Sequence, residues 1–103
     1  MRLVVEGLSE NPVSLLRRAG YTFQRHEGDE MSFVRPLARS GYPRFHCYVM
    51  LRGTNLSLHL HLDHKKHTYG DTIRHHGEYE NEGAIKEEGI RLTGILGEKT
   101  RIL

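Results

Sequence analysis

The sequence predicts an α+β fold in which a mostly antiparallel sheet of four to five strands carries a short N-terminal helix and a longer C-terminal helix on one face. Two periodicities support this prediction. Apolar residues alternate with polar ones along 45–51 and 56–63, as in half-buried strands. Along 12–19 and 83–96 they recur every three or four residues, as in amphipathic helices. We therefore expect one layer of strands covered by one layer of helices.

The chain has 103 residues, which is the size of one domain, so we expect a single α+β domain over 1–103. Cys47 is the only cysteine, which excludes an intrachain disulfide and fits a reducing compartment. No signal-peptide pattern is present, and no apolar run approaches the roughly 20 residues of a membrane-spanning helix. We therefore expect a cytoplasmic protein without membrane contact.

The N-terminal part predicts three strands and the short helix. An apolar run at 2–6 suits a first strand, and Asn11 followed by Pro12 is a helix start that should end before Gly20. Strands at 21–26 and 31–37 would be joined by a turn around a glycine. Their register stays open, because a three-residue loop sets Phe23 opposite Phe33 and a four-residue loop sets it opposite Val34.

The segments 45–51 and 56–62 predict a hairpin whose register can be derived from both periods. If opposing residue numbers sum to 107, four apolar pairs fall on a single face, and Met50 faces Ser57 on the other. The opposite face then pairs polar residues across the two strands: Tyr48 with His59, His46 with His61, and Arg44 with Asp63.

The C-terminal part predicts a long polar loop and then the longer helix. The segment 64–82 is rich in glycine and polar residues, and loops of that length often form the wall of a site. Helix 83–96 would bury Ile85, Gly89, Leu92 and Leu96, although each interior glycine costs about 1 kcal/mol relative to alanine. Residues 98–103 read as a tail.

Histidines are concentrated in the middle of the chain, with six of the eight between residues 59 and 76. Residues two apart on a strand lie about 6.6 Å apart and can share an ion, whereas residues four apart, at about 13 Å, generally cannot. One ion such as zinc would then be held by His46 and His61, which face each other across the hairpin. Either His59 or Asp63 would be the third ligand, and His76 or Glu78 of the loop could complete the site. The candidate metal ligands are His46, His59, His61, Asp63 and His76.

If the domain is an enzyme, a metal-activated water would suit hydrolysis of a phosphoester or an amide, with Glu78 as the catalytic general base. The first alternative is a non-enzymatic module that binds RNA or another phosphate-containing ligand. The second is an interaction domain without a ligand, on which the histidines form an ordinary solvated sheet face. The candidate nucleic-acid contacts are Arg17, Arg18, Arg44, Lys65 and Lys66.

Two resemblances accompany these patterns. The run 15–21 followed by a strand, Gly28 and a second strand resembles HicA-type toxins, which are mRNA-cleaving proteins with the double-stranded-RNA-binding-domain fold. Those toxins carry a catalytic histidine shortly after the glycine, where this chain has Asp29, Glu30 and Met31, so no catalytic residue transfers. The blocks 42–46, 60–63 and 76–79 are similar to small uncharacterised bacterial proteins, a resemblance that implies no activity.

Overall fold

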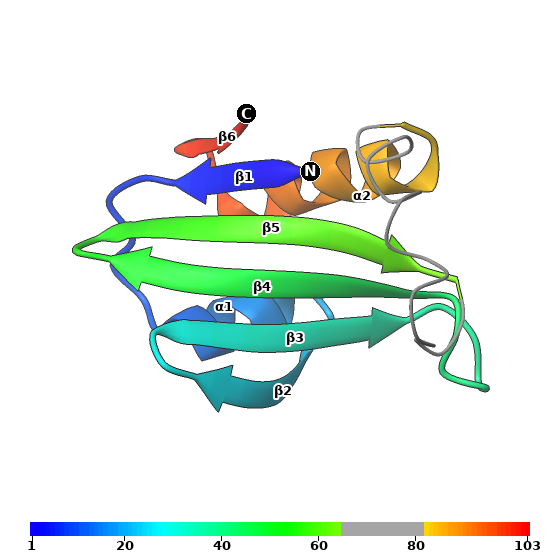
Figure 1. Cartoon of the computed structure of the whole chain (residues 1–103). Helices are drawn as coiled ribbons and strands as arrows, with labels where there is room; N and C mark the ends of the chain where they lie inside the picture. Colours follow the sequence, from blue (N-terminus) through cyan, green and yellow to red (C-terminus); the bar gives the residue numbers. More distant parts are fainter. Residues whose placement is uncertain (65–81) are drawn as a thin grey trace.

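A computed structural model describes residues 1–64 and 82–103. In this part of the chain, six antiparallel strands form one sheet in the order β2-β3-β4-β5-β1-β6, with two helices on one face (Figure 1). Neither described helix has the length and apolar content of a membrane span. The elements are β1 Arg2–Val5, α1 Pro12–Arg18, β2 Thr22–Glu27, β3 Glu30–Pro36, β4 Arg44–Arg52, β5 Asn55–Asp63, α2 Ala84–Leu96 and β6 Thr100–Ile102.

The predicted α+β class is confirmed, but the predicted strand number of four to five is too low. The additional strand is β6, which lies in the segment expected to be a tail. It pairs antiparallel with β1, so that Leu3 faces Ile102 and Val5 faces Thr100. A strand of three residues is too short to show a period of two in the sequence, which is why the pattern missed it.

The β4–β5 hairpin has the predicted register along its whole length. Leu51 faces Leu56, His46 faces His61 and Arg44 faces Asp63, with the same offset throughout. The turn is tighter than the four residues expected, because Arg52 already pairs with Asn55. Gly53 occupies the turn with a φ of +62°, a conformation that glycine adopts without steric cost.

The open question about the β2–β3 register is resolved by a β-bulge. Phe23 faces Phe33, and the two rings pack edge to face with centroids 5.6 Å apart. The turn nevertheless contains only two residues, since Glu27 pairs with Glu30. Neither loop length considered from the sequence is therefore right. Gln24 is the extra residue between the two registers, and a bulge of this kind re-aims the side chains around it.

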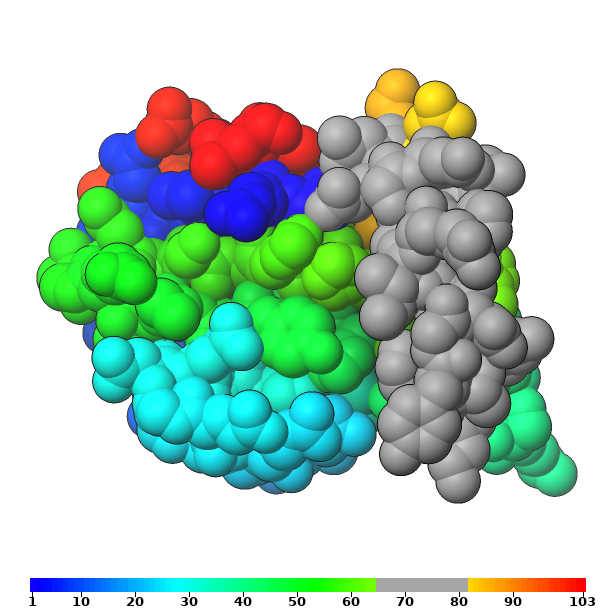
Figure 2. Space-filling view, viewed as in Figure 1, coloured from blue at the N-terminus to red at the C-terminus, as the bar shows by residue number. Residues whose placement is uncertain are grey.

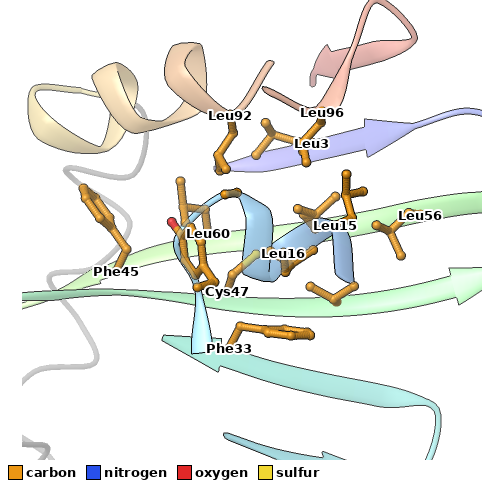
Figure 3. Close-up of a cluster of buried hydrophobic side chains, with 14 of the residues drawn as sticks. Leu3, Leu15, Leu16, Phe33, Phe45, Cys47, Leu56, Leu60, Leu92 and Leu96 are labelled. Atoms are coloured by element: carbon orange, nitrogen blue, oxygen red, sulfur yellow. The ribbon is translucent and has the colours of Figure 1, made fainter. Parts of the chain in front are cut away.

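The core lies between the sheet and the two helices (Figure 3). Burial agrees with the predicted faces of β4 and β5 except at Leu51 beside the turn, which was expected in the core but is 41% exposed. Cys47 is fully buried, as predicted. Burial raises the pKa of its thiol, so it is an unreactive core group. The largest fully buried side chains are Phe33, Leu3, Leu15, Leu16, Leu56, Leu58, Leu60, Leu92, Val49 and Cys47.

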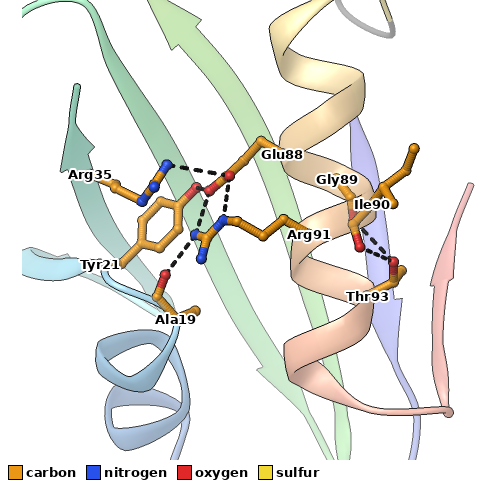
Figure 4. A network of polar contacts seen from close by, with 8 residues as sticks. All are labelled: Ala19, Tyr21, Arg35, Glu88, Gly89, Ile90, Arg91 and Thr93. Carbon is orange, nitrogen blue, oxygen red and sulfur yellow. Dashed lines mark hydrogen bonds and ion pairs between the residues drawn. The ribbon is translucent and has the colours of Figure 1, made fainter.

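A buried acid that the apolar pattern did not reveal joins the helices. Glu88 of α2 is only 4% exposed, and its carboxylate accepts hydrogen bonds from the Tyr21 hydroxyl at 2.6 Å and from Arg91 at 2.7 and 2.8 Å (Figure 4). Arg91 was expected outside the buried stripe of α2. Its guanidinium nevertheless reaches the core side of the helix, where it also donates to the carbonyl of Ala19 at 2.7 Å. Burial, followed by the bond to Glu88, raises the pKa of Tyr21, so the phenol stays protonated as the donor.

The predicted buried stripe of α2 is confirmed, and Gly89 has a packing reason. A Cβ at Gly89 would overlap Sδ of Met1 and lie 3.1 Å from its Cε. Met1 is 3% exposed, and its α-amino group donates to the carbonyl of Leu60 at 3.0 Å. The glycine therefore lets α2 approach the start of β1, which offsets its low helix propensity.

Candidate functional site

The face of the sheet opposite the helices carries the predicted polar pairs of β4 and β5. Because successive side chains of a strand point to opposite faces, the buried positions of Cys47 and Leu60 place His46 and His61 on this open face. Figure 2 shows the face, with β4 and β5 in green between β1 in blue and β2 and β3 in cyan. The predicted site therefore lies away from the helix-covered core.

His46 is the centre of the polar arrangement on this face, and it is only 7% exposed. Its Nε2 lies 2.6 Å from Oγ of Ser32 on β3, and its Nδ1 lies 3.4 Å from Oδ2 of Asp63 on β5. Direct strand partners of His46 are Val34 and His61, so both polar contacts are diagonal ones. The imidazole is thus held between its two neighbouring strands.

The hydrogen bonds continue from Ser32 to the edge of the sheet. Its hydroxyl donates to Oε1 of Gln24 at 3.0 Å, and Gln24 is the residue that the β2 bulge inserts. Gln24, Ser32, His46 and Asp63 thus follow one diagonal line over four adjacent strands. We call this set the diagonal chain.

Asp63 ends the diagonal chain, and the guanidinium of Arg44 lies beside it. Nε of Arg44 lies 3.6 Å from the same Oδ2 that faces His46, and the guanidinium carbon lies 4.7 Å from the ring centroid of Tyr42. Burial raises the pKa of Asp63, but the interaction with His46 and the positive charge of Arg44 outweigh it. The net pKa is below the ordinary value, so Asp63 is a carboxylate at neutral pH.

Aromatic rings line the face next to the diagonal chain. The rings of His59 and His61 have centroids 4.2 Å apart, and the Tyr48 ring meets His61 edge to face at 5.7 Å. Tyr48 also lies over His46, with centroids 4.4 Å apart. Three of the eight histidines therefore share one surface with a tyrosine.

The predicted metal ligands are brought together in part. His46, His61 and Asp63 are neighbours, and His59 adjoins His61. Within residues 1–64 and 82–103, no three side chains of histidine, cysteine or acidic residues are placed to hold a metal by themselves. The remaining predicted site residues lie outside the described part of the chain: His76, Glu78, Lys65 and Lys66.

The predicted nucleic-acid contacts fall on two sides of the molecule. Arg17 and Arg18 lie on α1, which covers the core face of the sheet, and Arg18 is bound by Glu10 at 2.8 Å. Arg44 lies on the opposite face beside Asp63. Among the described residues, these three arginines do not form one basic surface.

Sequence reasoning missed Ser32 and Gln24. The alternation around Phe33 places Ser32 on the open face, but its approach to His46 depends on the β3–β4 register, which the irregular connection between those strands hides. Gln24 reaches Ser32 only because of the bulge. Comparisons with protein-family models, with curated proteins and with solved structures found no match to this chain.

Proposed function

We propose that this protein binds a divalent transition metal ion such as zinc, with Nδ1 of His46 and Oδ2 of Asp63 as its first two ligands. The observation that carries the proposal is the separation of these two atoms, 3.4 Å, together with the direction of the hydrogen bonds behind the imidazole. An N–H···O bond between them would measure about 2.7–3.2 Å. A tetrahedral ion with bonds of about 2.0–2.2 Å places two ligands roughly 3.3–3.6 Å apart.

The proposal places the proton of a neutral His46 on Nε2, and the diagonal chain supports this choice. The Ser32 hydroxyl has one proton, which it donates to Oε1 of Gln24. In the proposed tautomer, the Ser32 oxygen accepts from Nε2–H of His46, and the two atoms lie 2.6 Å apart. In a neutral imidazole Nδ1 is then unprotonated and presents a lone pair to the carboxylate of Asp63. Two acceptors that face each other at this distance favour a cation between them.

This arrangement is the one that supports metal-binding histidines in proteins. A ligating imidazole usually donates its other N–H to an oxygen acceptor, which fixes the tautomer and the orientation of the ring. Ser32 supplies that acceptor here, and Gln24 holds Ser32 in turn. His61, which faces His46 across the hairpin, is the next donor, and the sequence predicts His76 and Glu78 as further ones. Water would fill any remaining position.

The test is zinc titration of the untagged full-length protein by calorimetry and elemental analysis. We expect one ion per chain. His46→Ala and Asp63→Ala should each weaken binding by more than the roughly 10–100-fold that loss of a supporting partner causes. His26→Ala is the matched control, because His26 is exposed on β2 away from the diagonal chain and should have no effect. Substoichiometric zinc, or equal affinity in the three variants, would refute the proposal.

A second measurement separates a metal ion from a proton as the cation. If His46 is an imidazolium paired with Asp63, both of its nitrogens are protonated in the metal-free protein at pH 8. The proposal expects a neutral ring with its proton on Nε2, which nitrogen-15 chemical shifts of labelled histidine distinguish directly. A doubly protonated ring at that pH would mean that the proton alone fills the place assigned to the metal.

A further inference from the structure

We infer that the proposed metal centre takes a dianionic oxyanion of the phosphate monoester class, bound jointly by the metal ion and the guanidinium of Arg44. The inference rests on the proposed function and adds the class of ligand. It starts from the state of Arg44, which lies beside Asp63 at the beginning of β4. This guanidinium is oriented by its surroundings, and its buried Nε has no acceptor among the described residues.

The guanidinium of Arg44 is positioned by the ring of Tyr42 and by electrostatic attraction to the carboxylate of Asp63. Its guanidinium carbon lies 4.7 Å from the centroid of the Tyr42 ring, a cation–π arrangement. Its Nε lies 3.6 Å from Oδ2 of Asp63, which is too long for a hydrogen bond. The buried Nε has no hydrogen-bond acceptor in the described part of the chain. A guanidinium has five N–H donors, and the proposal assigns those of the terminal fork to the ligand.

The outer part of Arg44 is accessible. The side chain is 21% exposed although Nε is buried, so the exposed area belongs to the rest of the side chain. Arginine presents a planar fork that matches two oxygens of a phosphate or carboxylate. Because Arg44 and the proposed metal ligand Asp63 are direct strand partners, one tetrahedral oxyanion could contact both the ion and the fork.

Charge selects a dianion over a monoanion. In the metal-free protein, Asp63 and Arg44 neutralise each other across 3.6 Å. A divalent ion bound to Asp63 turns the centre positive, and it then repels Arg44, whose guanidinium is always protonated. With neutral histidines the metal-loaded centre has two net positive charges. A phosphate monoester or inorganic phosphate restores neutrality, whereas a carboxylate or a phosphodiester restores only half of it.

The experiment titrates inorganic phosphate into zinc-loaded full-length protein by calorimetry. Phosphate should bind to the wild type, and Arg44→Gln should weaken it about tenfold or more, the loss expected for hydrogen bonds to a charged group. Arg44→Lys should fall between the two, because lysine keeps the charge without the fork. Arg25→Gln is the matched control, since Arg25 lies on the same face but is paired with Glu27 at 2.9 Å.

The zinc affinity of Arg44→Gln separates a ligand contact from a structural role. Removal of a positive charge next to the ion should leave zinc binding unchanged or tighter, while a damaged site would lose both ligands. A zinc-loaded wild type that does not bind phosphate, or an Arg44→Gln variant that binds it equally well, would overturn this inference alone. Failure of zinc to bind would overturn the proposed function as well.

Dimethyl phosphate provides the final arm and distinguishes a monoester from a nucleic-acid backbone. As a phosphodiester monoanion it should bind the zinc-loaded protein more weakly than inorganic phosphate. Equal or tighter binding of the diester would contradict the preference for a dianion and would point instead to the phosphates of a polynucleotide. Acetate tests the carboxylate class in the same way.

Discussion

Two buried polar clusters lie on opposite faces of the same sheet, and their donors and acceptors are matched to different degrees. On the helix-covered face, both oxygens of Glu88 receive short hydrogen bonds from Tyr21 and Arg91. On the open face, Nδ1 of His46 and Oδ2 of Asp63 stand 3.4 Å apart, and Nε of Arg44 has no acceptor in the described residues. The first cluster satisfies its own donors and acceptors, whereas the second leaves one buried donor without an acceptor among the described residues.

The difference separates a cluster whose polar groups satisfy one another from the cluster on which the proposed function rests. A buried polar group that is left unsatisfied costs about 1–3 kcal/mol, so a folded chain retains few of them. The Glu88 cluster avoids that cost by pairing its charges. In the open-face cluster the buried Nε of Arg44 bears the cost among the described residues, and under the proposal a ligand would bind beside it.

The largest expected effect is on the matched cluster. Glu88→Ala should lower the free energy of unfolding by about 3 kcal/mol, because it leaves Arg91 and Tyr21 without their buried partner. We place it at the low end of the range for buried pairs, since Arg91 remains 34% exposed to water. Urea denaturation measures the change. A loss below about 1 kcal/mol would show that this cluster contributes less to stability than the pairing implies.

The second effect tests how closely the helix-covered face is packed. Gly89→Ala should destabilise the protein by about 2 kcal/mol, because overlap with Met1 outweighs the gain in helix propensity. Gly94 is the matched control on the same helix, with nothing within 4 Å of an added Cβ. Gly94→Ala should therefore stabilise the protein by up to about 1 kcal/mol. Thermal unfolding of both variants compares them, and equal shifts would contradict the packing argument.

The third effect tests the diagonal chain as the support of the open-face cluster. Ser32→Ala should reduce zinc affinity by about 10–100-fold, because His46 loses the acceptor that keeps its proton on Nε2. Ser32→Thr keeps the hydroxyl and should retain most of the affinity, and Ser57→Ala on the exposed part of β5 serves as the control. The nitrogen-15 shifts of His46 should change only in Ser32→Ala. Unchanged affinity in that variant would remove Ser32 from the site.

The smallest expected effect is on the open-face cluster. Asp63→Asn should destabilise the metal-free protein by up to about 1 kcal/mol, because a carboxylate whose pKa is lowered in the folded protein contributes stability that an uncharged amide lacks. The corresponding change in the matched cluster, Glu88→Gln, should destabilise the protein more, because Glu88 is only 4% exposed. Chemical denaturation of both variants in the presence of a chelator measures the pair. An equal loss of stability in the two variants would contradict the contrast between the clusters.

The sequence predicted the central part of the site because two strands shared one short turn. Alternation along each strand and the closeness of the turn favoured the register that puts the four apolar pairs on one face, and that register put His46 opposite His61. In this hairpin, the alternation of apolar and polar residues along each strand was enough to predict which residues of the two strands face each other. The same reasoning placed Cys47 in the core and the helix stripe of α2 against the sheet.

Two kinds of feature could not be predicted: those that depend on an irregular backbone, and those that depend on a single polar residue within a buried apolar stripe. Gln24 reaches Ser32 through a bulge, and a bulge leaves no mark in the alternation of so short a strand. Glu88 lies within an apolar stripe where charge argues for exposure, and two of its partners, Tyr21 and Arg35, come from distant segments. β6 has only three residues. In each case the deciding contact is one that local periodicity does not encode.

The buried start of β1 has a practical consequence for any experiment on the open face. Met1 exchanges backbone hydrogen bonds with Leu60 at 2.8 and 3.0 Å, so a residue placed before it would continue the strand toward His61. An N-terminal affinity tag would therefore emerge next to the proposed metal centre, and a polyhistidine tag would bring competing ligands there. Leu103 is 65% exposed, but its N–H donates to the carbonyl of Arg2 at 2.8 Å, so a C-terminal tag would begin only one strand farther from β5 and should be removed as well.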